Sequence, residues 1–444
     1  MKHGILRVTS GFIFVLLIMS GCSKTDMQTA TENVSATARS KAKFDDQLSN
    51  QVILDWNLAA LEAQGGVTYL HALFSSRADA MMHIAMHDAL NAIIPVYEQY
   101  AYHNSSGDGA DPVLAAAQAA YTVLGALYPA AQPTLDNLRQ KYLAMTPDGA
   151  AEQKALMVGE AAGMAILTLR QNDGATQDPV GPMAVSDVPG VYNTVPPFTF
   201  VFGEFWKNME PFSLESPDQF RSSPPPALTS MEYAKDFNEI KELGGTTSRI
   251  RTPDQSFYAA FWYEYVEIGW NRIARIVAVD QDLGLWSSAR LFALMNMAIT
   301  DSYTAGWDAK FYYNFWRPYT AIRAAALDGN PRTAPDATWE SFLPTPPVPD
   351  YPSTHSVGAN AAATVLTMLT KGNMAFTTSS STAVPMYATR SFRNFKQAAD
   401  ENADSRVVAG IHFRFATEAG QDLGDAIGKW TVRNYLEPIK KNFE

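Results

Sequence analysis

Along most of this 444-residue chain, the apolar residues are spaced as they are in α-helices. They recur at intervals of three and four residues over stretches with little Gly or Pro, which is the pattern of a helix with one buried face. The expected helices cover residues 51–63, 77–94, 111–128, 133–172 with a break near 147–149, 230–244, 254–279, 285–307, 357–370 and 390–435. Strand-like alternation does not persist anywhere. The pattern therefore predicts an all-α fold, a helical bundle with long Pro-rich connections.

Two of these connections are long enough to matter for function. Residues 173–252 are rich in Pro, Gly, Ser and Thr but also carry many aromatic side chains, which makes the segment too apolar for disorder. Residues 330–351 form a second Pro-rich loop that leads directly into a predicted helix. We expect both connections to be ordered and packed against the helices.

The N-terminus has the layout of an export signal. Lys2 and Arg7 precede an apolar run at 12–19, and Ser20 and Gly21 lead into the chain's single cysteine. The run is too short to span a bilayer comfortably, so a signal peptide is the better interpretation.

Small residues directly before a lone cysteine resemble a bacterial lipoprotein signal. We expect residues 1–21 to be the signal peptide, Cys22 to be lipidated and residues 22–48 to be a flexible tether. The alternatives are an ordinary cleaved signal and a plain buried cysteine. The lipoprotein interpretation places the protein in the bacterial cell envelope, anchored to a membrane and either periplasmic or on the cell surface.

Composition and charge limit the kinds of partner that the protein can bind. The net charge is -11 and the pI is about 5.2, which argues against nucleic acid as a partner because nucleic-acid affinity depends on basic surfaces. A hydrophobic content of 47% predicts a globular body. We expect an N-terminal helical region at 49–252 and a C-terminal bundle at 253–437.

Three short segments of that C-terminal region carry a candidate site. They are KFYYNFWRP at 310–318, YPSTHS at 351–356 and SRVVAGIH at 405–412. Together they supply a lysine, two arginines, two histidines and a serine. A phosphate-sized oxyanion is held by several fixed cations and donors that point inward, because a single charge binds it weakly in water. The sequence therefore predicts one oxyanion pocket built from all three segments.

The same segments identify a family resemblance. Lys-x6-Arg-Pro, Pro-Ser-x-His and Ser-Arg-x5-His, in this order, resemble the signature of the vanadium-dependent haloperoxidase and type 2 phosphatidic acid phosphatase superfamily. The residues FWRP at 315–318 and FRF at 413–415 are more similar to the haloperoxidase branch. The motifs cover residues 310–412, and a looser similarity extends over about 50–435.

The resemblance implies a role for each motif residue. His412 would be the axial vanadium ligand of a haloperoxidase or the nucleophile of a phosphatase, and His355 the general acid and base. The remaining residues would bind the oxyanion: Lys310, Arg317 and Arg406 through their charges, Ser353 through its hydroxyl and Thr354 through its main-chain N–H.

Two positions depart from the family pattern. Thr354 stands where the family usually has Gly, and a β-branched residue resists unusual backbone angles. Ala416 stands four residues after His412, where the family usually has an Asp that orients the imidazole. His412 must then find another acceptor, either a main-chain carbonyl or an acid such as Asp404.

The resemblance implies a haloperoxidase that holds vanadate and oxidises a halide with hydrogen peroxide. The alternative is a phosphomonoesterase with a phosphohistidine intermediate, which needs no cofactor and acts on a phosphate ester. A third possibility is a scaffold with reduced catalysis. The FWRP wording, the large N-terminal region and the long aromatic connection favour the haloperoxidase.

Other histidines and aromatic residues of the chain are better explained by packing than by catalysis. His83 and His87 share one helix face, and we interpret them as packed, hydrogen-bonded residues rather than metal ligands. We interpret Trp262, Tyr263, Tyr265 and Trp270 as core packing.

The spacing of Arg406 and His412 also has a geometric consequence. If the two residues lay on one continuous helix, their side chains would leave its axis about 120° apart and about 9 Å along it.

Overall fold

The fold is all-α. The computed structural model describes residues 48–66, 71–372 and 374–439, and these described residues belong to one compact unit. The predicted signal, Cys22 and nearly all of the predicted tether lie outside the described residues. The α-helices are α2 (Gln51–Ala63), α3 (Ala72–Ile93), α4 (Pro112–Leu127), α5 (Gln132–Met145), α6 (Ala150–Leu169), α7 (Met231–Leu243), α8 (Pro253–Phe261), α9 (Val266–Asp280), α10 (Leu285–Tyr313), α11 (Pro318–Arg323), α12 (Thr354–Leu369), α13 (Phe395–Val408) and α14 (Arg414–Asn434).

Helix ends follow the capping residues in the sequence. The Asp111, Ser230 and Thr252 side chains accept main-chain N–H groups at the starts of α4, α7 and α8, and Pro112 and Pro253 occupy first-turn positions where no N–H is needed. These local signals explain why the predicted starts lie within a residue or two of the observed ones.

Two small sheets correct the expectation that no strand forms. β1 (Val180–Gly181) pairs with β2 (Val201–Phe202), and β3 (Phe376–Ser379) pairs with β4 (Thr389–Phe392), both antiparallel. The predicted helix from residue 390 was therefore wrong at its start. These strands are too short for a period of two to register, and α13 begins only after Asn394, whose side chain accepts the N–H of Gln397.

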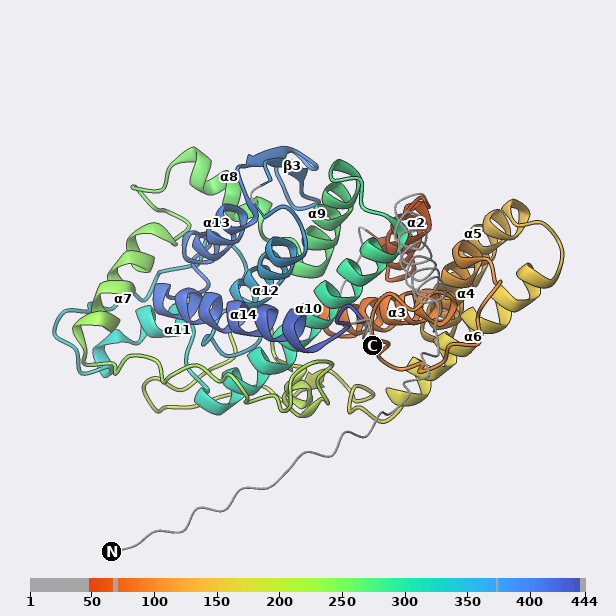
Figure 1. Cartoon of the computed structure of the whole chain (residues 1–444). Coiled ribbons are helices and arrows are strands. Elements are labelled where there is room, and N and C mark those ends of the chain that lie inside the picture. The colour runs from red at the N-terminus through yellow and green to blue at the C-terminus, as the bar shows by residue number, and fades with distance from the viewer. Residues whose placement is uncertain (1–47, 67–70, 373, 440–444) are drawn as a thin grey trace, which may run out of the picture. The chain divides into compact units, whose positions relative to one another are not determined.

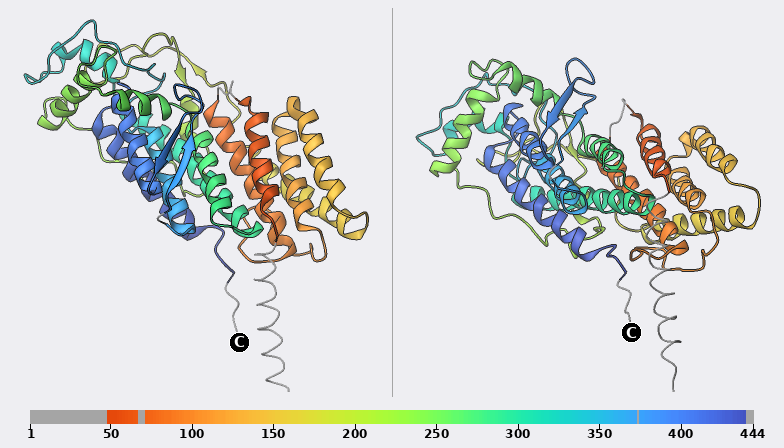
Figure 2. Two further views of the ribbon diagram at one scale, coloured as in Figure 1. Left: turned by 90° about the horizontal axis from the view of Figure 1, so that it is seen from above. Right: turned by 45° about the horizontal axis from the view of Figure 1, so that its top comes forward.

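Helix α10 lies between two groups of helices (Figures 1 and 2). It packs against α3 on one side, and α3 in turn packs against α4 and α6. On the other side it packs against α12, which also contacts α13 and α14. Its C-terminal end, at Lys310–Tyr313, thereby reaches the region where the motif segments meet.

Helices α12 and α14 approach each other unusually closely. Gly420, Gly424 and Gly428 recur at every fourth position on the face of α14 that meets α12. A β-carbon at Gly424 would lie 2.1 Å from the carbonyl oxygen of Val357, which is well inside van der Waals contact. The three glycines therefore let the backbone of α14 rest directly on the first turns of α12.

The long connection at 173–252 is ordered, as predicted. Its main chain bonds to the Lys-x6-Arg-Pro segment, with Tyr192 donating to Asn314 O at 2.8 Å and Trp316 donating to Gly190 O at 2.9 Å. It also reaches the second Pro-rich loop, where Phe202 donates to Pro347 O at 2.9 Å. These bonds fix the aromatic side chains of the connection next to the candidate site.

None of the helices within the described ranges is long and apolar enough to cross a lipid bilayer.

Candidate active site

The three motif segments converge on one cavity of about 580 Å³. Six of the seven predicted site residues line it: Lys310, Arg317, Thr354, His355, Arg406 and His412. Ser353 does not. Segments that are up to about a hundred residues apart in sequence therefore meet as predicted. The hydrogen bonds that each residue makes there differ.

Four of these residues, Lys310, Arg317, His355 and Arg406, lie at the ends of helices. Lys310 lies in the last turn of α10, and Arg317 caps the N-terminus of α11, whose first residue is Pro318. His355 lies in the first turn of α12, and Arg406 in the last turn of α13. Helix ends bring side chains and unpaired main-chain groups to the same place, which suits an anion site.

His412 is placed by a chain reversal. Helix α13 ends at Val408, and Gly410 takes a positive φ of 79°, so Arg406 and His412 do not share one continuous helix. The N–H groups of Ile411 and His412 both approach the carbonyl of Arg406, at 3.2 and 3.3 Å. This C-terminal cap folds the chain back and carries His412 toward the cavity.

Arg317 is buried and tied to the main chain of the other segments. Its Nε donates to Val348 O at 2.7 Å, and its Nη1 donates to Ile411 O at 2.7 Å. Nη1 also lies 3.0 Å from Nε2 of His412. The guanidinium therefore joins the Pro-rich loop and the His412 segment at the cavity wall.

Lys310 is also buried, and its ammonium group is already saturated. Nζ donates to the carbonyls of Pro349, Asp350 and Pro352 at 2.8, 2.9 and 2.7 Å. An ammonium has three N–H donors, so all of them serve the loop that leads into α12. Desolvation, followed by Arg317, lowers the pKa of Lys310 well below its usual value, but three carbonyl acceptors around Nζ require the three donors of the charged ammonium, which holds the loop and adds its charge to the cavity.

Arg406 keeps an unused donor. Its Nη1 donates to Trp262 O at 2.8 Å, whereas its buried Nε has no hydrogen-bond partner among the described residues. The guanidinium lies over the Tyr263 ring, 5.5 Å from the ring centre. A buried donor without a partner is costly, so this group is suited to receive an acceptor from a ligand.

At the start of α12, His355 and Thr354 face the cavity, and Ser353 is turned away from it. His355 Nδ1 and Thr354 Oγ1 are buried without partners in the described part of the chain. Ser353 Oγ accepts the hydroxyl of Ser356 at 3.1 Å, and the Ser353 N–H donates to Ala416 O at 2.8 Å. The structure therefore does not bring Ser353 into contact with the cavity.

His412 has an acidic neighbour that the motifs did not reveal. Oδ1 of Asp350, in the loop before α12, lies 2.9 Å from His412 Nδ1. The two atoms are within ion-pair distance, but the N–H and the oxygen are not aligned into a full hydrogen bond. Asp404 does not take this role, because it pairs with Arg414 at 2.7 Å and accepts the Tyr258 hydroxyl.

Burial and mutual repulsion set the charge states of the site. Desolvation, followed by the nearby cations, lowers the pKa of both His355 and His412 well below the usual value, so both imidazoles are neutral. Desolvation also lowers the pKa of Arg406 to about 10. For Asp350, desolvation raises the pKa to about 7, while Arg317 and Lys310 act in the opposite direction.

Aromatic side chains make up much of the remaining wall. The cavity is lined by Phe198, Phe200 and Phe202 from the long connection, by Trp307 and Tyr303 from α10, and by Tyr263 and Tyr265 between α8 and α9. Interpreting the whole 262–270 cluster as core packing was therefore wrong for both tyrosines. It holds for Trp262 and Trp270, which are buried and stack 6.4 Å apart.

Comparisons with known proteins agree with this geometry. A family model described as the VCPO second helical-bundle domain matches residues 290–441, which include all three motif segments. The vanadium chloroperoxidase of Curvularia inaequalis is 25% identical over 496 residues, covering 85% of this chain and 81% of that protein. The chain is thus similar to vanadium-dependent haloperoxidases over most of its length, and the family model matches its C-terminal third.

Solved structures of superfamily members share the fold. The first bacterial vanadium-dependent iodoperoxidase superposes with a TM-score of 0.76 at 25% identity, covering 89% of this chain and 99% of that one. Holo-type and apo-type bacterial vanadium-dependent chloroperoxidases superpose with TM-scores of 0.62 and 0.63 at 16% identity. Each match covers 82% of this chain, and they cover 92% and 94% of the respective chloroperoxidase chains.

One departure from the superfamily pattern is harmless to the backbone. Thr354 is the first residue of α12 and is not among the residues with positive φ, so its position does not need the freedom of Gly. Its side chain instead packs against Gly306 of α10, where a β-carbon would lie 3.0 Å from Thr354 Oγ1. The extra methyl and hydroxyl at residue 354 therefore fit a space that Gly306 leaves open.

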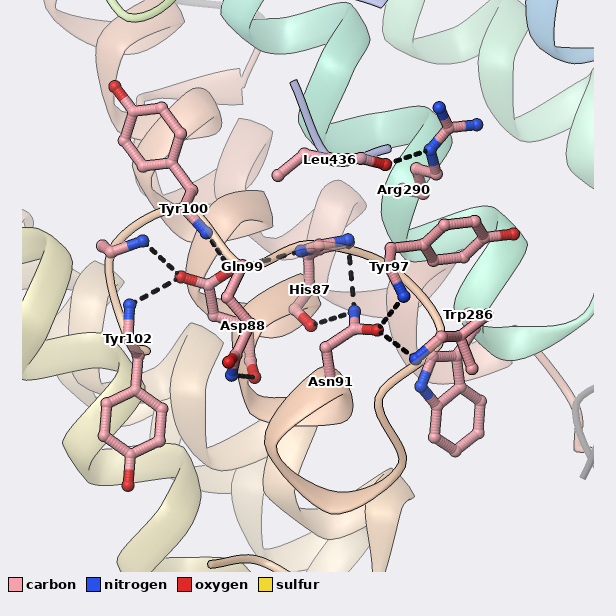
Figure 3. Close-up of polar contacts among 12 residues, drawn as sticks. His87, Asp88, Asn91, Tyr97, Gln99, Tyr100, Tyr102, Trp286, Arg290 and Leu436 are labelled. Atoms are coloured by element: carbon pink, nitrogen blue, oxygen red, sulfur yellow. Dashed lines mark hydrogen bonds and ion pairs between the residues drawn. The ribbon is translucent and has the colours of Figure 1, made fainter. Parts of the chain in front are cut away.

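The second histidine pair, His83 and His87, belongs to the packing of α3, and Figure 3 shows the contacts of His87. Asn91 Nδ2 lies 3.1 Å from His87 Nε2, and Asp88 accepts the main-chain N–H groups of Tyr100 and Tyr102 at 2.9 and 2.8 Å. His83 Nε2 lies 2.9 Å from Asn57 Nδ2. Both histidines are fully buried, which confirms that they are packed and hydrogen-bonded.

Proposed function

We propose that this protein is a vanadate-dependent haloperoxidase that oxidises a halide with hydrogen peroxide in the 580 Å³ cavity. The observation that carries the proposal is the convergence of three buried cations, Lys310, Arg317 and Arg406, on two neutral histidines. The similarity to a chloroperoxidase and an iodoperoxidase, described above, supports the same chemistry.

The cavity residues fit a tetrahedral oxyanion. Asp350, behind the cavity wall, supplies one negative charge near Arg317, and Glu264, which lines the cavity, is paired with Arg272 at 2.7 Å. The excess positive charge is buried, so a bound anion would compensate it. The unused Nε donor of Arg406 is available to hydrogen-bond that anion.

Each residue then has a defined task. Arg317 and Arg406 would hold the anion by charge and N–H donation, and Lys310 would add its charge through the loop that it anchors. The N–H groups of the first turn of α12 would complete the cradle. Vanadate, when bound, supplies a Lewis-acidic centre that activates peroxide without a change in its own oxidation state.

The two histidines would divide the remaining work. His412 is neutral, so its Nε2 lone pair would be available to hold the vanadium. His355 is also neutral, and its Nδ1 has no partner in the described part of the protein, so it can accept a proton from peroxide and later return it. The aromatic wall restricts the access of water to these groups.

The test uses the purified mature chain with and without vanadate. We expect vanadate loading to give peroxide-dependent oxidation of iodide or bromination of a diketone, and His412→Ala to abolish it. Hydrolysis of p-nitrophenyl phosphate, measured in parallel, distinguishes the phosphatase alternative. Vanadate-inhibited hydrolysis without halide oxidation, or the absence of both activities, would contradict the proposal.

We further propose that residues 1–21 are a lipoprotein signal and that Cys22 carries the lipid that anchors the enzyme in the cell envelope. The support is the sequence alone, namely the basic start, the short apolar run and the small residues before the single cysteine. Expression in a bacterium fed a labelled fatty acid should label the wild type and not Cys22→Ser. Labelling of both proteins, or of neither, would contradict this proposal.

A further inference from the structure

Asp350 is a buried carboxylate that lacks a well-aligned hydrogen-bond donor. Neither of its side-chain oxygens makes a well-aligned hydrogen bond among the described residues, although the nearby main-chain N–H of Phe413 favours its charged form, and its exposed fraction is 0%. The nearest charged or ring nitrogens given by the structure are His412 Nδ1 at 2.9 Å and Arg317 Nη1 at 3.7 Å. A carboxylate in such a place is costly unless it accepts a hydrogen bond, and His412 Nδ1 is within reach.

The main chain on both sides of this carboxylate is fixed. The Asp350 N–H donates to Phe315 O at 2.9 Å, and the Asp350 carbonyl accepts a hydrogen bond from Lys310 Nζ at 2.9 Å. Both partners belong to the Lys-x6-Arg-Pro segment. The residue therefore links that segment, the loop before α12 and His412, and its carboxylate has little freedom to move away.

The position that usually supplies such an acid in the superfamily is closed here. Ala416 is fully buried, and its carbonyl accepts the N–H of Ser353 at 2.8 Å. Asp404 is engaged by Arg414 and Tyr258. Neither residue is therefore placed to serve His412, whereas Asp350 approaches it from a different segment.

We infer that Asp350 is the positioning residue of His412: its carboxylate accepts the Nδ1 proton and so presents Nε2, with its lone pair, to the bound anion. Arg317 Nη1 lies 3.0 Å from Nε2 and 3.4 Å from Nδ1, so it is close to both ring nitrogens and the assignment of the tautomer rests on Asp350. An acid that fixes the tautomer and orientation of a ligating imidazole commonly matters for ligand affinity. The part of the inference that concerns vanadate depends on the proposed function, and the part that concerns the tautomer does not.

Two substitutions separate positioning from simple electrostatics. Asp350→Asn removes the negative charge but keeps an oxygen that can accept the Nδ1 proton, whereas Asp350→Ala removes both. If Asp350 acted only through its charge, both variants would bind an anion more tightly. If it positions His412, Asp350→Ala should weaken vanadate binding by roughly 10–100-fold, while Asp350→Asn should bind at least as tightly as the wild type.

The readouts are vanadate affinity by equilibrium dialysis and the His412 tautomer by NMR of protein labelled with ¹⁵N-histidine. His412→Gln assigns the resonance, and thermal unfolding shows whether each variant is folded. We expect the Nδ1–H tautomer to dominate in the wild type and in Asp350→Asn, and to lose its dominance in Asp350→Ala. The same tautomer in all three proteins, or vanadate binding by Asp350→Ala that is unchanged or tighter, would overturn the inference. A wild type that binds no vanadate would count against the proposed function, and the tautomer comparison would still decide the role of Asp350.

Discussion

Gly424 of α14 lies so close to Val357 of α12 that a β-carbon at residue 424 would stand 2.1 Å from the Val357 carbonyl oxygen. Val357 is two residues after His355, in the early part of α12, so the contact sets where α12 presents its histidine. The obstacle is a backbone atom, which cannot rotate away as a flexible side chain can.

We therefore predict that Gly424→Ala lowers the free energy of unfolding by about 1–3 kcal/mol or more, because the two helices must move apart. Urea unfolding followed by far-UV circular dichroism measures the change. Gly125→Ala on α4 is the matched control, since a β-carbon there meets only the end of the Gln132 side chain, at 3.1 Å. It should leave stability unchanged or raise it by up to about 1 kcal/mol. Equal effects in the two variants would argue against the close packing of α12 and α14.

Lys310 should matter for stability as well as for the anion. Lys310→Met leaves the three carbonyls of Pro349, Asp350 and Pro352 without their donor. Because buried acceptors without partners are costly, we expect a loss of roughly 2–4 kcal/mol in the free energy of unfolding. Thermal or urea unfolding checks this. The surface variant Lys429→Met, which loses only an exposed pair with Asp425, should change stability by less than about 1 kcal/mol, and a similar small change at Lys310 would contradict the prediction.

Arg406 should be needed as a guanidinium and not only as a cation. Its Nη1 donates to Trp262 O while its buried Nε has no partner among the described residues, so the guanidinium can hold this carbonyl and an oxyanion at the same time. Lysine cannot make both contacts, so Arg406→Lys should weaken vanadate binding about 10-fold or more while the protein stays folded. Equilibrium dialysis measures the affinity. The control is Arg323→Lys at the partly exposed pair with Glu340, and equal affinities in the two variants would show that charge alone suffices at residue 406.

A pH-dependent effect is expected at Asp79, which lies outside the active site on α3. Burial raises the pKa of Asp79 to about 8, with Glu267 acting in the same direction and Gln64 and Arg275 opposing the shift. The folded state therefore keeps a proton that the unfolded chain releases at about pH 4, so this residue's contribution to stability is full below about pH 4 and is lost as pH rises through about 8.

Asp79→Asn removes this titration while its side-chain oxygen can still accept the hydrogen bond from Gln64. The stability of the variant relative to the wild type should grow between pH 4 and pH 9, by an amount on the order of 2–5 kcal/mol. Urea unfolding at a series of pH values checks the slope. A difference in stability that stays flat across this pH range would contradict the raised pKa of Asp79.

Much of the fold could be predicted because its signals are local. The helices carry an apolar period and recognisable caps such as Asp111 and Ser230, which act within one turn. The site could be predicted because its cations and histidines lie in three short segments with fixed spacing. Which helices bring those segments together could not be predicted, because helix packing depends on contacts between residues that are far apart in the sequence.

What could not be predicted depends on contacts between distant segments. Asp350 has no fixed spacing to His412, and its only signal is an acid in a Pro-rich loop beside a cationic site. Tyr263 and Tyr265 line the cavity because the chain breaks between α8 and α9, which no Pro or Gly announces. Gly410 did offer a signal, since glycine near the end of a helix often takes the positive φ of a C-terminal cap.

The position of α10 bears on how this enzyme can be dissected. A fragment that begins near residue 290 would keep all three motif segments, yet it would strip α10 of its contact with α3. Leu291, Leu294 and Ile299, each no more than 1% exposed in the intact chain, belong to a helix that is buried on nearly every side. Such a fragment would expose apolar side chains that α3 covers in the intact chain. We therefore expect the motif-bearing half to aggregate when it is expressed on its own.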